Sequence, residues 1–166
     1  MKTILSFILL FTLSVSYSQE IEGAFGFKFG ERYNINPGKT IMFHKVKNVK
    51  LPYRQFQRYD ISVNRNQEIF LIRAEYYATT EANAIYETNL LEQLIEEKYN
   101  KKPTKVSEKK DIHYTGITIG KQTIGVVREK KTVRILYRDN ELGKEQDKDL
   151  REQRLEKNKK KYLNAL

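Results

Sequence analysis

Short stretches of alternating apolar and polar residues dominate the second half of the chain, and very short turns separate them. Residues 111–119, 123–128 and 132–138 each alternate in this way, which is typical of strands that bury one face. Turns of this length join antiparallel neighbours, because a parallel pair needs a crossover of about a dozen residues. The stretches 59–63 and 68–77 predict a further hairpin in the first half. The chain is therefore expected to form a mainly antiparallel sheet.

Two more strands are expected nearer the N-terminus. Residues 23–30 read GAFGFKFG, in which Phe25, Phe27 and Phe29 recur at every second position. Alternation resumes over 39–49, after a turn rich in Asn, Pro and Gly. Together these segments predict a twisted sheet of six or seven strands.

The period of the apolar residues changes to about 3.6 between the first hairpin and the last strands, which predicts a helix over 81–99. Thr79 and Thr80 precede it as candidate N-caps, while Asn100 is a candidate left-handed cap and Pro103 stops continuation. The face expected to pack on the sheet carries Ala84, Leu91, Leu94, Ile95 and Tyr99. The pattern indicates an α+β fold with one helix packed on a face of the sheet.

The last segment, 141–166, differs from the rest because it is highly charged and has few large apolar residues. Opposite charges such as Asp147 with Arg151, and Glu156 with Lys160, stand four residues apart and can support a solvated helix. We expect one α+β domain over 19–140, followed by a charged helical tail that docks loosely on it.

Residues 1–18 have the layout of a secretory signal peptide. Lys2 provides the positive start, residues 4–15 form an apolar run, and the small residue Ser18 precedes a cleavage point before Gln19. The run is shorter than the roughly 20 apolar residues of a membrane-spanning helix. The protein is expected to be exported to the periplasm or the extracellular space, with no transmembrane segment after the signal is removed.

Four stretches carry a resemblance to a known group of proteins. They read FGFKFG after the signal, FQRYDISVNRNQEIFLIRAE in the first hairpin, LLEQLIEEKYNKKP at the end of the helix, and ILYRDNEL before the tail. In these features the chain resembles small exported bacterial α+β proteins of an uncharacterised family, although Asn100 stands where that pattern has a glycine. The resemblance implies the fold and export, and it implies no activity and no site residues.

Several common chemistries lack the residues that they need. The chain has no Cys, and its only serines after residue 18 are Ser62, in mid-strand, and Ser107, in the lysine-rich stretch 100–110 that is expected to be a loop. Neither has the Gly-x-Ser-x-Gly setting of a nucleophile. His44 and His113 alone make too few ligands for a metal. We therefore expect no catalytic residues, no metal and no cofactor.

Carboxylates offer the strongest enzymatic alternative. Asp60, Glu68 and Glu75 lie in or beside the first hairpin, and a pair of carboxylates about 5–10 Å apart can hydrolyse glycosidic bonds. Arg73 shares a strand face with Glu75 and can simply pair with it. A secreted hydrolase that uses Asp60 and Glu75 is the alternative reading, and whether the chain is an enzyme stays open, with a non-enzyme favoured.

The charge pattern favours a binding role. The net charge is +10, and the stretch 39–58 contains six basic residues and no acid, whereas 59–99 contains eight acids and three bases. Stretches 100–110 and 128–138 each carry five bases and one acid. The residues expected to bind are Lys45, Lys47, Lys50, Arg54 and Arg58.

A basic face attracts anions over about 8 Å at physiological salt. The preferred hypothesis is an exported, non-catalytic binding module that acts on an anionic polymer, a lipid headgroup or an acidic protein. Nucleic acid is not expected as a partner of an exported chain. An inhibitor or assembly factor for another envelope protein, working through an exposed sheet face or edge strand, is a further alternative.

Overall fold

The structure is a computed structural model, and it describes residues 20–35, 43–47, 49–50, 52–53, 55–109 and 111–163, apart from the side chains of 108, 109 and 161–163. The expected signal peptide, 1–18, therefore lies outside the described residues, as does Arg54. No helix in the described part of the chain is long and apolar enough to cross a membrane.

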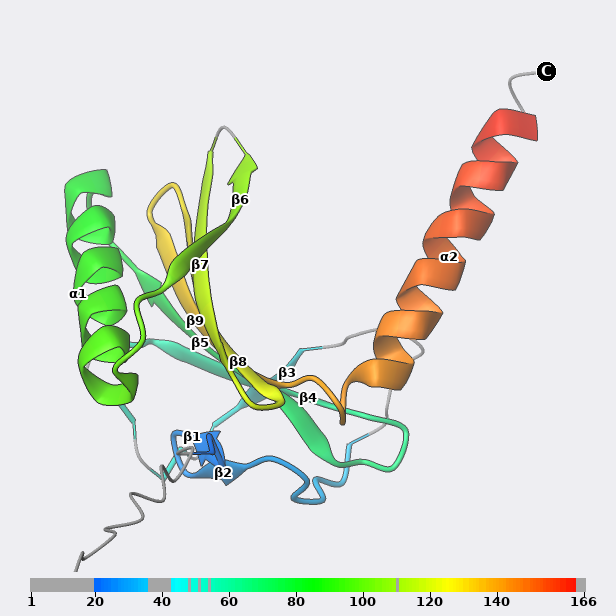
Figure 1. Cartoon of the computed structure of the whole chain (residues 1–166), viewed down its shortest axis with the longest axis horizontal. Coiled ribbons are helices and arrows are strands. Elements are labelled where there is room, and N and C mark those ends of the chain that lie inside the picture. Colours follow the sequence, from blue (N-terminus) through cyan, green and yellow to red (C-terminus); the bar gives the residue numbers. More distant parts are fainter. Residues whose placement is uncertain are drawn as a thin grey trace, which may run out of the picture.

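A seven-stranded sheet, antiparallel throughout, forms the centre of the fold (Figure 1). Its order is β3-β4-β5-β9-β8-β7-β6. The strand bounds are His44–Val46 for β3, Arg58–Val63 for β4, Ile69–Tyr77 for β5, Thr104–Lys109 for β6, Ile112–Ile119 for β7, Gln122–Glu129 for β8 and Thr132–Asp139 for β9. The predicted fold class is confirmed, including the hairpin of β4 with β5 and the meander of β7, β8 and β9.

The stretch 23–30 is not the single strand that its alternating phenylalanines predict. It forms a small hairpin of β1 (Gly23–Ala24) and β2 (Phe27–Lys28), because the chain reverses at Phe25 and Gly26, whose φ angles are 55° and 85°. The Phe25 ring packs edge-on against three core rings, those of Phe56, Tyr59 and Tyr137. The Phe25 side chain thus covers the core beside the sheet.

The main sheet gains a strand where a basic loop was expected. Residues 104–109 pair with β7 as the edge strand β6, with a bulge between Lys105 and Ser107. An edge strand commonly carries charged side chains and bulges that discourage pairing with other chains, so its apolar alternation is weak. This is why the pattern in the sequence did not reveal it.

Helix α1 (Glu81–Tyr99) begins and ends where its capping residues predict. The Thr80 side chain accepts a hydrogen bond from the Asn83 backbone N–H at 3.1 Å. Asn100 adopts the left-handed conformation, with φ of 49°, and ends the helix. The predicted helix is confirmed at both ends.

Replacing Thr80 with alanine should destabilise the protein by about 1 kcal/mol, because an unpaired N–H remains at the start of α1. Urea unfolding followed by circular dichroism measures the change. Thr79→Ala is the matched control, since the Thr79 hydroxyl accepts from the exposed Asn83 side chain and, among the described residues, from no backbone N–H. Equal losses in the two variants would contradict the capping role of Thr80.

The buried face of α1 differs from the predicted one at a few positions. Ala84, Leu91 and Ile95 are buried as expected, but Leu94 is 41% exposed. The polar residues Glu87 and Thr88 are buried in its place. Glu87 and Leu94 stand seven residues apart and so lie within about 20° of each other around the helix, which means that this side of α1 is buried at Glu87 and exposed at Leu94.

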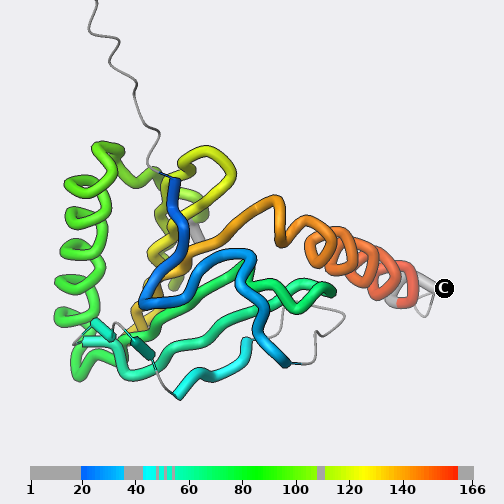
Figure 2. The backbone as a smooth tube through the Cα atoms, turned by 90° about the horizontal axis from the view of Figure 1, so that it is seen from below, coloured from blue at the N-terminus to red at the C-terminus, as the bar shows by residue number. Residues whose placement is uncertain are grey.

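Helix α2 (Lys144–Leu163) rises from the end of β9 on the side of the sheet away from α1 (Figures 1 and 2). Two ion pairs hold its base, Arg138 to Asp147 at 2.7 Å and Arg65 to Asp149 at 2.6 Å. Residues 151–160 are all exposed, so the helix leaves the body after its first turns. The expected charged C-terminal helix is confirmed, and only its base is docked.

Candidate ligand-binding site

The two faces of the sheet have different environments because successive residues of a strand point to opposite faces. Buried apolar residues on one face, such as Ile124, Ala74 and Ile135, pack with α1 and the N-terminal hairpin into one core. The other face presents Leu71, Arg73 and other residues at alternate positions on neighbouring strands. This second face lies on the side of α2, and we call it the open face.

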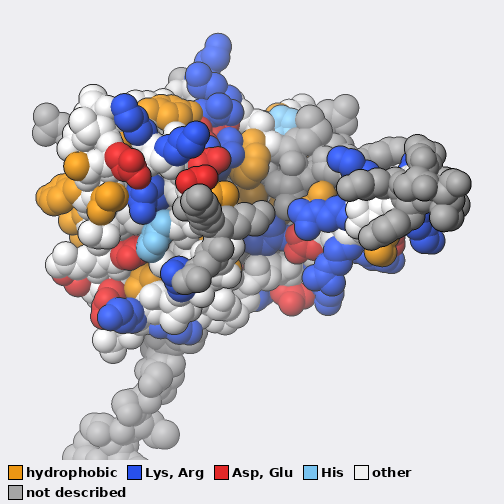
Figure 3. Space-filling model, turned by 90° about the horizontal axis from the view of Figure 1, so that it is seen from above, with side chains coloured by type: hydrophobic (Ala, Val, Ile, Leu, Met, Phe, Trp, Pro, Cys, Tyr) orange, Lys and Arg blue, Asp and Glu red, His pale blue; other side chains and the backbone are white. Residues whose placement is uncertain are grey.

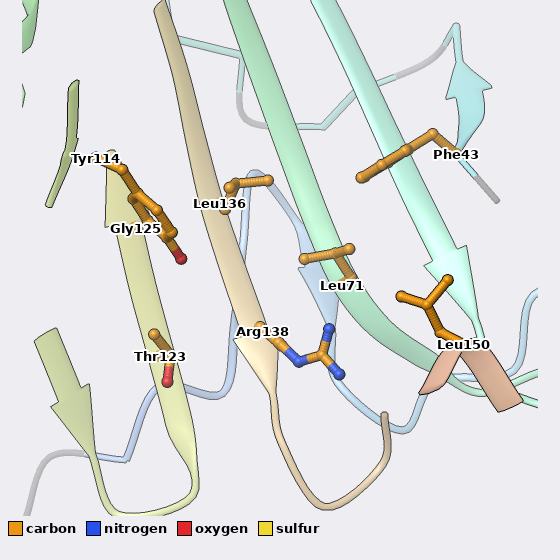
Figure 4. A pocket seen from close by; sticks show the side chains of 8 residues that line it. All are labelled: Phe43, Leu71, Tyr114, Thr123, Gly125, Leu136, Arg138 and Leu150. Carbon is orange, nitrogen blue, oxygen red and sulfur yellow. The ribbon is translucent and has the colours of Figure 1, made fainter. Parts of the chain in front are cut away.

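The open face holds an apolar hollow of about 470 Å³ beside the base of α2. Its walls come from β5, β7, β8, β9, α2 and the residue before β3 (Figure 4). The lining residues are Phe43, Leu71, Tyr114, Thr123, Gly125, Leu136, Arg138 and Leu150. A volume of this size suits a small ligand, since ligand pockets usually measure about 300–1,000 Å³.

A glycine shapes one wall of the hollow. The Tyr114 ring lies across Gly125, with its hydroxyl toward the middle of the hollow (Figure 4). A Cβ atom at position 125 would lie 2.7 Å from Cε2 of Tyr114. Gly125 therefore lets the ring lie flat on the sheet and keep the hollow open.

Arg138 brings positive charge to the apolar wall. Its guanidinium donates hydrogen bonds to the Asp147 carboxylate at 2.7 Å and to the Gly143 carbonyl at 3.3 Å. Only 19% of its side chain is exposed, whereas the Asp147 side chain is 41% exposed. A ligand anion in the hollow could compete with Asp147 for the same guanidinium, because Arg has several donors in a fixed fork.

Unpaired polar atoms are buried next to the hollow. Ser62 pairs across the strands with Leu71, and its Oγ has no hydrogen-bond partner among the described residues. Gln146 precedes Leu150 by one turn of α2, and neither atom of its buried amide has a partner within the described ranges. Buried polar groups are normally hydrogen-bonded, so these atoms are unsatisfied groups of the fold. Neither Ser62 nor Gln146 is among the residues that line the hollow.

An ion network occupies the other half of the open face. Asp60 is fully buried and accepts hydrogen bonds from Arg58 at 2.9 Å and from Arg73 at 2.8 Å. The Arg73 guanidinium stacks over the Phe43 ring, 3.6 Å from its centroid. The network therefore supports one wall of the hollow.

Glu75 belongs to the same network and is held in its charged form. Arg134 donates to it at 2.8 Å and the Tyr77 hydroxyl at 2.5 Å. Burial by itself would raise the pKa of Glu75, but these hydrogen bonds and the charge of Arg73 outweigh it and lower that pKa. A general acid needs a pKa near the working pH, so this environment suits an ion-pair role better than acid catalysis.

The structure brings only some of the expected binding residues together. Lys45 pairs with Asp60 across β3 and β4, so it shares the open face with Arg58. Lys47 and Lys50 are exposed beyond the end of β3. The Arg58 side chain is 37% exposed and bonded to Asp60, so much of its charge is already neutralised. Arg54 lies outside the described residues.

The two histidines lie far apart in the sheet. His44 is on the edge strand β3, and His113 is on β7, next to the opposite edge. His113 Nε2 lies 2.7 Å from a Glu92 oxygen that also accepts from Thr115 at 2.6 Å, which ties α1 to β7. No group of three potential metal ligands occurs within the described ranges.

The hollow was missed from the sequence because its lining comes from six separate segments. A glycine inside a strand, Gly125, was a usable signal, since such a glycine often marks a close approach of another group. Arg138 was counted only as part of a basic stretch. Nothing local links either residue to Phe43 or Leu150.

These features define an antiparallel α+β protein with one helix-covered sheet face and one open face that holds an apolar hollow. The chain matches no protein-family model, no curated protein and no solved structure.

Proposed function

We propose that this chain is an exported, non-catalytic binding protein, and that its ligand is an anionic amphiphile held in the hollow of the open face. The observation that carries the proposal is the combination of an apolar cavity of about 470 Å³ with Arg138 in its wall. An apolar chain gains free energy as it leaves water, at roughly 25 cal/mol per Å² buried. An acidic head group would bind the Arg138 guanidinium by taking the place of Asp147, which is 41% exposed and now bonds to it.

The surrounding charge supports an anionic ligand. Lys45 shares the open face, and Lys47 and Lys50 are exposed beyond the end of β3. The whole chain carries a net charge of +10. Long-range attraction of this kind raises the rate at which anions arrive, and it weakens as salt is added. Export rests on the layout of residues 1–18.

Binding is preferred to hydrolysis because of the state of the two carboxylates. Asp60 and Glu75 share the open face, but arginines bond to both, and the pKa of Glu75 is lowered. A hydrolase would need one of them to hold a proton near neutral pH.

A single tryptophan can report on the hollow, because the chain has none. In a Phe43→Trp variant, dodecanoate added below its critical micelle concentration should change the fluorescence in a saturable way. Adding Leu136→Glu should weaken that binding about tenfold or more, since it removes apolar surface and places a competing carboxylate in the hollow.

Thr132→Glu is the matched control in the same background. Thr132 lies on β9 and the same sheet face as Leu136, but it is not part of the hollow's lining. It adds the same charge and should leave dodecanoate binding nearly unchanged. A Phe43→Trp protein that shows no saturable response, or equal losses in the two glutamate variants, would refute the proposed function.

A further inference from the structure

Helix α2 carries its charges in separate stripes. Four of its five acidic residues follow a spacing of four, three and four residues, which places them on one face of the helix: Glu145, Asp149, Glu152 and Glu156. The fifth, Asp147, lies on another side and bonds to Arg138. Asp149 bonds to Arg65, and the shallow depression beside them is also lined by Glu152 and Glu156. The acidic stripe therefore lies on the side of the turn between β4 and β5.

The face of α2 that contributes to the hollow is basic beyond its apolar base. Arg154 and Lys157 follow Leu150 by four and seven residues, so they lie within about 40° of it around the helix axis. Both are exposed. At a rise of about 1.5 Å per residue, they stand about 6 Å and 10 Å past Leu150 along the helix.

Other basic residues of α2 point elsewhere. Lys148 and Arg151 are also exposed, but they lie about 160° and 100° around the helix from Leu150. Figure 3 shows basic side chains along α2 where it projects from the body. Among the basic residues of α2 whose side chains the structure describes, Arg154 and Lys157 are therefore the two that lie within about 40° of Leu150. The others lie about 80° or more away around the helix: Lys144, Lys148, Arg151, Lys159 and Lys160.

We propose that Arg154 and Lys157 bind the head group of the ligand, and that this head group is a phosphate monoester. The inference rests on the proposed function, because it places the apolar chain of the same ligand in the hollow. Arg138 alone could satisfy a single carboxylate near Leu150. Two further cations, about one and two turns beyond Leu150 on the same face of α2, suit a head group that carries more charge and more acceptor oxygens. A phosphate monoester has about −1.5 to −2 charges and three such oxygens at pH 7.

The test compares two ligands with the same chain and different heads, dodecyl phosphate and dodecanoate. Both are titrated into the Phe43→Trp protein below their critical micelle concentrations. Reversing two charges, in Arg154→Glu with Lys157→Glu, should weaken dodecyl phosphate binding about tenfold, because two attractions become repulsions. Dodecanoate binding should change by about twofold at most.

The control variant reverses the charges of Lys148 and Arg151, which changes the net charge by the same amount. It should leave both affinities within about twofold of the parent, and circular dichroism should show that α2 persists. The milder pair Arg154→Gln with Lys157→Gln should give an intermediate loss for dodecyl phosphate, which covers the case in which the double glutamate variant fails to fold.

The outcomes separate this inference from the proposed function. If both ligands bind the parent but the two charge-reversed pairs behave alike, the head-group assignment is wrong and the hollow remains a binding site. If neither ligand binds the parent, both the head-group assignment and the proposed function are wrong. Inorganic phosphate at the same concentration should not displace dodecyl phosphate; displacement would show a phosphate site without an amphiphile.

Discussion

Replacing Asp60 with alanine should destabilise the protein by about 3–5 kcal/mol, because it leaves arginines without their buried partner. Asp60 is fully buried, and the Arg73 side chain that bonds to it is only 14% exposed. Urea unfolding followed by circular dichroism measures the loss as a shift of the midpoint.

Asp149→Ala is the matched control for this effect. Asp149 also bonds to an arginine, at 2.6 Å, but the Arg65 side chain is 59% exposed. Water can solvate the guanidinium once the carboxylate is removed, so the loss should be far smaller. Similar losses in the two variants would contradict the role of the Asp60 network.

A double variant shows whether the network stabilises the fold or specifies its register. Asp60 and Arg73 are direct partners across β4 and β5. Asp60→Leu with Arg73→Met should recover much of the stability, because both partners of the buried pair are removed together and apolar groups take their place. That result would mean that the Asp60–Arg73 pair serves mainly to align β4 with β5 and to support Phe43 beside the hollow.

Replacing Glu87 with methionine should stabilise the protein by about 1–3 kcal/mol at pH 7.5, because a buried carboxylate with an unpaired oxygen is removed. Only 3% of Glu87 is exposed, and its Oε1 has no hydrogen-bond partner among the described residues. Burial raises the pKa of Glu87. The gain should appear in urea unfolding.

The same raised pKa predicts a pH dependence. The folded chain holds the Glu87 proton more tightly than the unfolded chain does. Protonation of Glu87 therefore stabilises the fold. This stabilisation is complete below the ordinary pKa of 4.5 and is lost as the pH rises through the pKa of the folded state. The advantage of the methionine variant should therefore shrink as the pH falls from 7.5 toward 4.5, and stay small below that pH.

Glu87→Gln is the control for titration. It keeps the size of the side chain and removes the proton equilibrium, so its stability relative to the parent should rise with pH over the same interval. A methionine variant no more stable than the parent at pH 7.5 would show that the Glu87 carboxylate has a stabilising partner.

The sequence predicted those parts of the fold that depend on neighbouring residues. Helix α1 was bounded correctly because Thr80 and Asn100 cap it through contacts and backbone angles within a few residues. The hairpins were found because their strands alternate and their turns are short. The phenylalanines of 23–30 led to the wrong prediction of a single strand. Packing against Phe56 and Tyr59 produces the same alternation in the sequence as a strand does.

The charges of individual residues could not be interpreted from the sequence in the same way. Arg58 was expected to be a free binding cation, but it bonds to Asp60, two residues along the same strand, and the strand register brings Glu75 to 3.6 Å from it as well. The sequence suggested that Arg73 can pair with Glu75, and Nη1 of Arg73 lies 3.6 Å from Oε1 of Glu75. Residues that stand two apart on one strand point to the same face, so the sequence alone can predict that they pair. Which residues of another strand lie beside them depends on the register of the two strands.

The amino-acid sequence by itself determined an antiparallel α+β fold, with one packed helix and one charged helix, since periodicity, caps and turns are local. Only the tertiary structure decided which sheet face stays open and where the hollow lies. Phe43 and Leu150 reach the same cavity from distant parts of the chain. Their meeting depends on the register and curvature of the strands between them and on where α2 docks, and these are set by contacts between remote segments.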